Sequence, residues 1–182
     1  MSELFPSAGK LSRGYDKDMV FQFFGDAREA YEGGATADQI SFDEIRRAAF
    51  PLVRGGYDTR SVDRSLSRLE SAFIQRDRAN YITRNGEAAW YAKIADDATV
   101  LYPRLLRPHG ERFGHPDGRG YDAQEVDQLL DGLADYFDNN SGIKESDIRF
   151  AVFKSAKGDN AYIEAQVDAF LGRAMYVLLA VS

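Results

Sequence analysis

Four versions of one short motif occur along the chain, and this repetition limits the possible folds more than any other feature. Each copy has a tyrosine, which lies between glycine and aspartate in three of the four copies. A valine follows each tyrosine by five residues, and an aspartate comes directly after that valine in three copies. A phenylalanine precedes each tyrosine, at Phe5, Phe50, Phe113 and Phe153. Four matches indicate repeated structural units. Copy by copy, the motif residues are Gly14, Tyr15, Asp16 and Val20; Gly56, Tyr57, Asp58, Val62 and Asp63; Gly120, Tyr121, Asp122, Val126 and Asp127; and Tyr162, Val167 and Asp168.

The motif predicts a loop that leads into a capped helix. Glycine turns the chain without steric cost, and the aspartate after the tyrosine is a good helix N-cap. In the third copy, Glu125 follows Asp122 at the spacing of a reciprocal capping pair. Apolar residues recur at offsets of 0, 4, 7 and 11, which places them on one helix face. These stripes are Val20, Phe24, Ala27 and Tyr31; Val62, Leu66, Leu69 and Phe73; Val126, Leu130, Leu133 and Phe137; and Val167, Leu171, Ala174 and Leu178.

The four copies form two pairs, because Tyr57 follows Tyr15 by 42 residues and Tyr162 follows Tyr121 by 41. This spacing predicts a duplicated unit of two helix pairs: residues 1–80, a linker helix within 81–107, and residues 108–182. No strand-like alternation of any length occurs, so we expect an all-α protein that forms one compact bundle. About seven helices are expected, over residues 16–32, 41–50, 58–84, 87–106 (ended or kinked by Pro103), 122–138, 145–153 and 163–179.

Composition narrows the function classes. The chain of 182 residues is 44% hydrophobic and 13% aromatic, which is enough for a sizeable core. Its net charge of −6 argues against nucleic-acid binding, which needs surplus Lys and Arg. There is no cysteine, so disulfides and thiol catalysis are excluded. The first ten residues have no apolar signal-peptide core, and no stretch is long and apolar enough to span a bilayer. We therefore expect a cytoplasmic protein. A location close to the membrane stays an alternative.

The order of phenylalanine, basic loop, Gly-Tyr-Asp, Val-Asp and leucine stripe resembles the N-terminal domain of DivIVA, a family of bacterial cell-division and cell-pole scaffold proteins. Several copies in one chain are similar to the DivIVA-domain repeat proteins of actinobacteria. The resemblance covers most of the chain outside the linker. The second and third copies carry the whole motif, whereas the first has Phe21 in place of the second aspartate, and the fourth lacks the glycine and the first aspartate. The resemblance implies a non-enzymatic scaffold linked to cell division or polar growth.

In that family the loop before Gly-Tyr-Asp contacts the anionic inner membrane through an exposed phenylalanine beside an arginine. Here only Arg13 and Arg119 match the arginine, and Ser12 and Gly118 stand at the phenylalanine position. The family's long coiled coil is absent. The resemblance therefore implies at most weak contact with an anionic membrane.

No catalytic or cofactor signature stands out, and we expect no enzyme activity, cofactor or metal. His109, Glu111, His115 and Asp117 lie together in one loop and are of zinc-binding types, but their spacing favours a flexible polar loop. The tyrosines are expected to be half-buried and to pin each loop to its helix pair, with the hydroxyl bonded to a partner. The aspartate after each valine is expected at the surface of the first helical turn.

One charge feature remains. The loops between phenylalanine and tyrosine are net positive in an acidic protein, which suggests contact with an acidic partner protein or anionic lipid. The alternatives are a peripheral anionic-membrane binder, and an enzyme or small-ligand binder with the His109–Asp117 loop at a cleft between the halves. Homo-oligomers are possible. The candidate partner-binding residues are Lys10, Arg13, Arg54, Arg119, Lys154 and Lys157.

Overall fold

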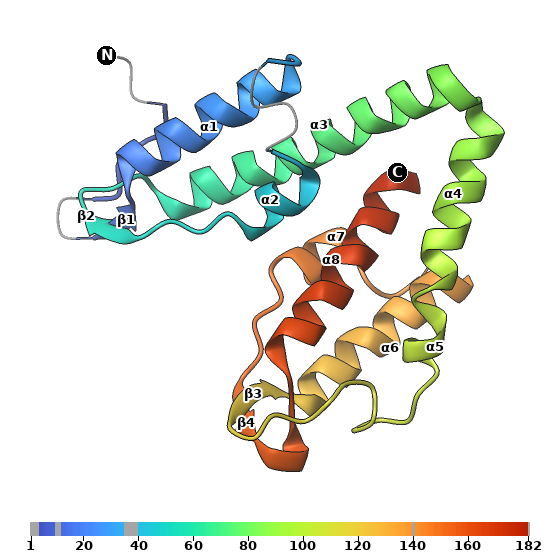
Figure 1. Ribbon diagram of the computed structural model, residues 1–182. Helices are drawn as coiled ribbons and strands as arrows, with labels where there is room; N and C mark the ends of the chain where they lie inside the picture. Colours follow the sequence, from blue (N-terminus) through green and yellow to red (C-terminus); the bar gives the residue numbers. More distant parts are fainter. Residues whose placement is uncertain (1–3, 10–11, 35–39, 140, 182) are drawn as a thin grey trace. The chain divides into compact units, whose positions relative to one another are not determined.

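The computed structural model describes residues 4–9, 12–34, 40–139 and 141–181, and the chain divides into two compact units (Figure 1). Unit 1 is residues 1–80 and unit 2 is residues 81–182. The elements of unit 1 are β1 (Arg13–Tyr15), α1 (Lys17–Tyr31), α2 (Phe42–Arg47), β2 (Leu52–Arg54) and most of α3 (Thr59–Asn85). Those of unit 2 are α4 (Glu87–Thr99), α5 (Tyr102–Leu105), β3 (Arg119–Asp122), α6 (Ala123–Asn139), α7 (Glu145–Arg149), β4 (Ser155–Lys157), a 3-10 turn (Gly158–Asn160), β5 (Ala161–Tyr162) and α8 (Glu164–Val181).

The motif aspartates begin three helices, as the sequence predicts. The Asp16 carboxylate accepts hydrogen bonds from the backbone N–H of Asp18 and Met19, at 3.1 and 3.0 Å. Asp58 accepts from the N–H of Ser61 at 2.9 Å. Asp122 accepts from the N–H of Glu125 at 3.0 Å, but Glu125 does not complete a capping box, because its carboxylate binds the backbone N–H and ammonium of Lys154.

The apolar stripes are buried and form the core of each unit. In α6, Val126, Leu130 and Leu133 are fully buried, and the whole predicted stripe of α8 is buried. In unit 1, residues from α1, α2 and α3 share one core cluster with Tyr57: Val20, Ala30, Ile45, Val62, Leu66 and Phe73. These observations confirm the predicted helix faces except at Tyr31, which is 43% exposed at the end of α1.

The fold is mostly helical, but the all-α prediction is wrong in one respect: each loop between a motif phenylalanine and its tyrosine contains a short β-strand. β1 pairs with β2, and β3 pairs with both β4 and β5, all antiparallel. The backbones approach so closely that a Cβ on Gly14 would lie 2.1 Å from the carbonyl oxygen of Tyr57, and one on Gly120 would lie 2.1 Å from that of Tyr162. Strands of two to four residues are too short to show an alternating pattern, which is why the sequence does not reveal them.

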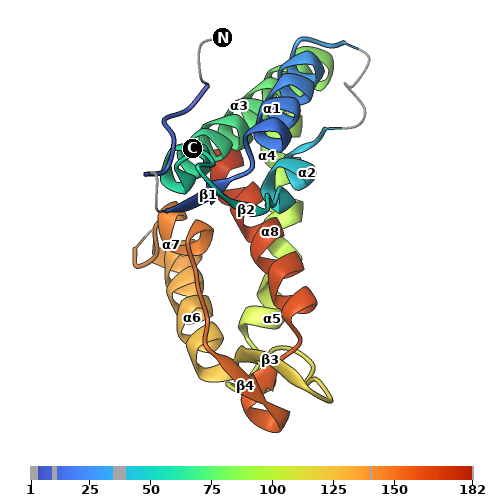
Figure 2. The same cartoon turned by 90° about the vertical axis from the view of Figure 1, so that its left-hand side faces the viewer.

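The predicted linker helix is two helices, and both belong to unit 2. α4 packs against α8, and α5 packs against α6 (Figures 1 and 2). The Trp90 indole N–H of α4 donates to the carbonyl of Ala180, near the end of α8, at 3.3 Å. Pro103 lies in the first turn of α5, where proline's missing N–H costs nothing. The first of the two helices, α4, therefore ends before Pro103, at Thr99, rather than at the proline. α7 also ends earlier than predicted, at Arg149.

Candidate functional site

Each phenylalanine that precedes a motif tyrosine packs on the tyrosine of the other motif in its unit. In unit 1, the ring centroids of Phe5 and Tyr57 are 5.5 Å apart, and those of Phe50 and Tyr15 are also 5.5 Å apart. In unit 2, Phe113 lies 5.2 Å from Tyr162, and Phe153 lies 5.1 Å from Tyr121. The two motifs of a unit therefore hold each other in place.

The aspartate after the motif valine accepts a hydrogen bond from the tyrosine of the other motif. Tyr162 donates to Asp127 at 3.0 Å. Burial raises the pKa of Tyr15, and the carboxylate of Asp63, with which its hydroxyl bonds, raises it further. Burial and the charge of Asp168 likewise raise the pKa of Tyr121. The Asp168 carboxylate also accepts a hydrogen bond from the Tyr121 hydroxyl. The tyrosines thus have the partners predicted for them, but Tyr57 and Tyr162 are buried rather than half-buried, at 5% and 0% exposed. The aspartates were predicted at the surface, and for Asp127, which is 2% exposed, this is wrong.

The fourth such bond cannot form, because Phe21 stands where the first copy would need an aspartate. Phe21 is 63% exposed, whereas the ring of Tyr57 is buried. The Tyr57 hydroxyl accepts from the backbone N–H of Leu4 at 3.3 Å, just as Tyr162 accepts from that of Arg112 at 3.1 Å. Among the residues that the structure describes, no acceptor for the Tyr57 hydroxyl proton is found.

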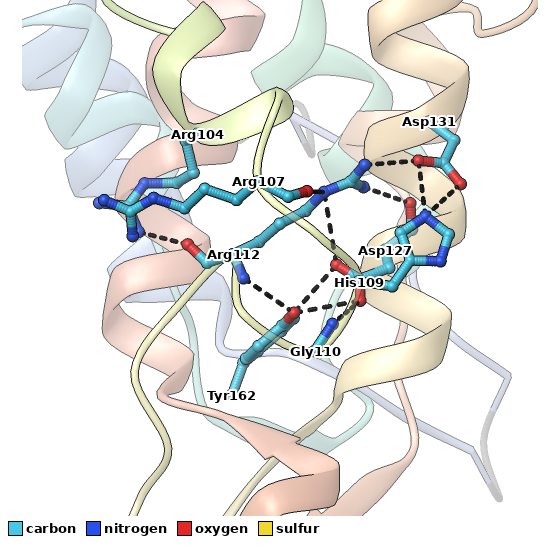
Figure 3. A network of polar contacts seen from close by, with 8 residues as sticks. All are labelled: Arg104, Arg107, His109, Gly110, Arg112, Asp127, Asp131 and Tyr162. Carbon is cyan, nitrogen blue, oxygen red and sulfur yellow. Dashed lines mark hydrogen bonds and ion pairs between the residues drawn. The ribbon is translucent and has the colours of Figure 1, made fainter.

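Unit 2 contains a buried polar network around Arg112 (Figure 3). Arg112 is 4% exposed. Its guanidinium donates to the backbone carbonyl of Asp127 at 2.8 Å and to the carboxylate of Asp131 at 2.6 Å. It also donates to the carbonyl of Arg107 at 3.3 Å. Because a buried charge must be paired to be tolerated, this network ties the loop before β3 to α6.

The Asp127 carboxylate is fully used within this network. It accepts from Tyr162 and from the backbone N–H of Gly110 at 2.7 Å, and it lies 3.7 Å from the guanidinium of Arg112. These partners fix the Asp127 carboxylate between β5, the loop before β3 and α6. Nothing in the sequence singles out Arg112, which lies in a loop of ordinary polar composition; the signal that points to the network is the Val-Asp dipeptide.

The two loop histidines are held apart by different partners. His109 contacts Asp131 at 3.0 Å, and the Nδ1 of His115 lies 2.8 Å from the carbonyl oxygen of Ala161. Burial alone would raise the pKa of Asp131, but bonds from Arg112 and His109 lower it overall. No group of three or more metal-ligating side chains is found in the described part of the chain. A hollow of about 720 Å³ lies beside His109, with Asp122, Asp127, Lys157 and Asp159 among its lining residues.

The strand register places predicted partner-binding cations opposite each other in both units. Arg13 of β1 is the register partner of Arg54 of β2, and Arg119 of β3 is the partner of Lys157 of β4. All four side chains are exposed. Like charges directly opposite each other destabilise a β-ladder. In the described ranges, none of the four forms an ion pair with a carboxylate.

The other two predicted partner-binding cations, Lys154 and Lys10, do not belong to such a pair in the described part of the chain. Lys154 forms an ion pair with Glu125, which raises the pKa of the lysine and lowers that of the glutamate. Lys10 lies outside the described residues. The candidate site is therefore a pair of cations in each unit, Arg13 with Arg54 and Arg119 with Lys157, which we call the cation pairs.

No protein-family model matches the chain, and searches of curated proteins and of solved structures also give no match. No helix in the described ranges is both long and apolar enough to cross a membrane. The candidate site thus depends on the geometry of this chain alone.

Proposed function

We propose that the chain is a non-enzymatic interaction module, built from two copies of one unit, and that each unit binds an acidic partner protein through its cation pair. The observation that carries this proposal is the strand register, which places Arg13 against Arg54 and Arg119 against Lys157. The two cations of each pair repel each other in the free chain. An anionic group of the partner that lies between them would offset this repulsion and bind both cations.

The proposed duplication is supported by matching contacts. Both units have the exchanged phenylalanine–tyrosine pairs and the close approach at Gly14 or Gly120. An Asp N–H also bonds the carbonyl before the second strand in each unit, from Asp16 to Pro51 at 2.9 Å and from Asp122 to Lys154 at 2.8 Å. The resemblance to DivIVA-domain repeat proteins favours a scaffold role in cell division or polar growth, at a cytoplasmic location.

The test is charge reversal with a matched control. Glutamate-rich peptide is titrated into the whole chain, into Arg13→Glu/Arg54→Glu and into Arg119→Glu/Lys157→Glu. In each variant the altered unit should bind about tenfold more weakly, while the other unit keeps its affinity, because two favourable charge contacts in the altered unit become repulsive. The control is Arg84→Glu/Arg107→Glu, which makes the same change in net charge at exposed positions outside the cation pairs. Equal losses in all three variants would show that only net charge matters and would contradict the proposal.

Vesicles of phosphatidylglycerol test the membrane alternative in the same variants. We expect little co-sedimentation of the wild-type chain at about 150 mM salt, because exposed charges are screened beyond about 8 Å there. Strong, salt-insensitive sedimentation would favour a peripheral membrane binder instead.

A further inference from the structure

The outer edge of β4 in unit 2 has no strand beside it. The sheet order is β4-β3-β5, so β4 pairs on one side only. The N–H of Asp122 in β3 donates to the carbonyl of Lys154 at 2.8 Å, which shows that Lys154 directs its backbone groups toward β3. In an antiparallel ladder alternate residues face opposite ways. The backbone groups of Phe153 and Ser155 therefore face away from β3.

These outward groups are accessible. Across the described residues, no backbone hydrogen bond is found for Phe153 or Ser155 on the outer side. Ser155 and Lys157 are exposed. In Figures 1 and 2 the chain from α7 to β4 runs along the outside of unit 2, with no ribbon beside the outer edge of β4. The edge thus offers free donors and acceptors to another extended chain.

The side chains along this edge differ between its two faces. Lys157 and its partner Arg119 share one face, because register partners project to the same side. Alternation places Ala156 and Lys154 on the other face, where the ammonium of Lys154 is paired with Glu125. Val152 is 90% exposed, and Phe150 beside it is 56% exposed. The edge is therefore cationic at Lys157, and exposed apolar side chains lie just before β4 in the chain.

We propose that β4 receives an extended segment of the acidic partner as an added strand. The segment would carry alternating acidic and apolar residues, with an acidic one beside Lys157, one strand away from Arg119, and an apolar one near Val152, just before β4. In this recognition mode main-chain hydrogen bonds supply affinity and alternate side chains supply specificity. The inference rests on the proposed function, because it assigns the binding mode of the same cation pair.

The probe is a short peptide of alternating glutamate and valine, added to the whole isotope-labelled chain. We expect amide chemical-shift changes at Ser155 and its neighbours. The same peptide with alternate amides N-methylated keeps its charge and loses donors on one edge; it should bind about tenfold more weakly. Ser155→Pro removes the outward N–H of β4 and should weaken binding of the unmodified peptide similarly. A peptide of alternating lysine and valine should not bind.

The outcomes separate the two proposals. If the N-methylated peptide and Ser155→Pro bind as well as the originals, while Arg119→Glu/Lys157→Glu binds poorly, strand addition is overturned and the acidic-partner proposal stands. If the glutamate–valine peptide binds neither the wild-type chain nor any variant, strand addition and acidic-partner binding are both overturned for unit 2. A third outcome is that the glutamate–valine peptide fails to bind and that Arg119→Glu/Lys157→Glu makes the chain self-associate. The cations would then serve only to keep the β4 edges of two copies of the chain apart, and the inference is likewise overturned.

Circular dichroism checks that Ser155→Pro is folded. Ala156→Pro is the matched comparison, because its N–H faces β3 and its loss should reduce stability as well as binding. Peptide binding that survives in folded Ser155→Pro would still count against strand addition.

Discussion

At the scale of single residues, Phe21 is the position where a substitution should improve the protein. Phe21→Asp would supply the acceptor that the Tyr57 hydroxyl lacks among the described residues and would remove an exposed apolar ring. We expect a gain of about 0.5–1.5 kcal/mol in the free energy of unfolding, measured by urea denaturation. The gain should vanish in a Tyr57→Phe background, as a double-mutant cycle requires. An equal gain in both backgrounds would mean that the introduced carboxylate acts through some other contact.

Arg112 should be the most sensitive charged residue of unit 2. Arg112→Met would leave Asp127, with its buried carboxylate, without a neighbouring positive charge. Removing one partner of a buried pair costs about 3–5 kcal/mol. Arg107→Met is the control: its side chain is exposed, and only its backbone carbonyl serves the network. We expect that control to stay within about 0.5 kcal/mol of wild type; a similar loss in both variants would contradict the role assigned to the guanidinium.

Burial of the motif tyrosines, together with their bonds to aspartate, predicts a loss of stability in alkali. Folding raises the pKa of Tyr15, Tyr121 and Tyr162, so the folded state holds these phenol protons more tightly than the unfolded state. Their contribution is complete below the unfolded pKa of about 10 and is lost as pH rises through the higher folded value. Urea midpoints should therefore fall above about pH 10. The fall should be smaller in Tyr162→Phe and unchanged in Tyr91→Phe, whose side chain is exposed; identical slopes in all three proteins would count against this origin.

At the scale of elements, the strand crossings predict opposite effects for glycine-to-alanine changes. A Cβ at Gly14 or Gly120 would lie 2.1 Å from a backbone oxygen, and backbone cannot move aside cheaply. We expect Gly14→Ala and Gly120→Ala each to cost more than about 3 kcal/mol. Gly25 lies within α1, and no atom beyond its chain neighbours and the backbone of its own helix lies within 4 Å of its Cβ position, so Gly25→Ala should stabilise by up to about 1 kcal/mol. Thermal melts of the three variants measure this; a neutral Gly120→Ala would mean that the ladder is looser than described.

The elements also show which features a sequence reveals and which it hides. Caps and stripes depend on residues within one helix, so Asp16 and the leucines of α6 were predictable from spacing. The strands, the exchanged rings and the bond from Tyr162 to Asp127 depend on residues far apart in the sequence, 35 positions in the case of that bond. The cations were predictable as members of basic loops. Their pairing was not, because only strand register places Arg119 against Lys157.

At the scale of the whole molecule, the division into two units predicts two separable transitions. Leu66 lies in the core of unit 1 and Leu130 in that of unit 2, and alanine at either should cost about 2–5 kcal/mol. The single tryptophan, Trp90, reports on unit 2 alone. In urea, Leu130→Ala should shift the fluorescence transition, whereas Leu66→Ala should shift only the circular dichroism signal. Equal shifts of both signals in both variants would show that the units unfold together.

The exchange of rings between motifs has a consequence for how the chain is made. As a ribosome releases it from the N-terminus, Phe5, Tyr15 and α1 emerge first, and their aromatic partners Tyr57 and Phe50 are still to be synthesised. Until then the apolar face of the first helix has only Phe5, which lies 5.2 Å from Phe24, to pack on. Stable structure should therefore appear in two late steps, one after each even-numbered motif, and a nascent chain halted between motifs would be a natural substrate for chaperones.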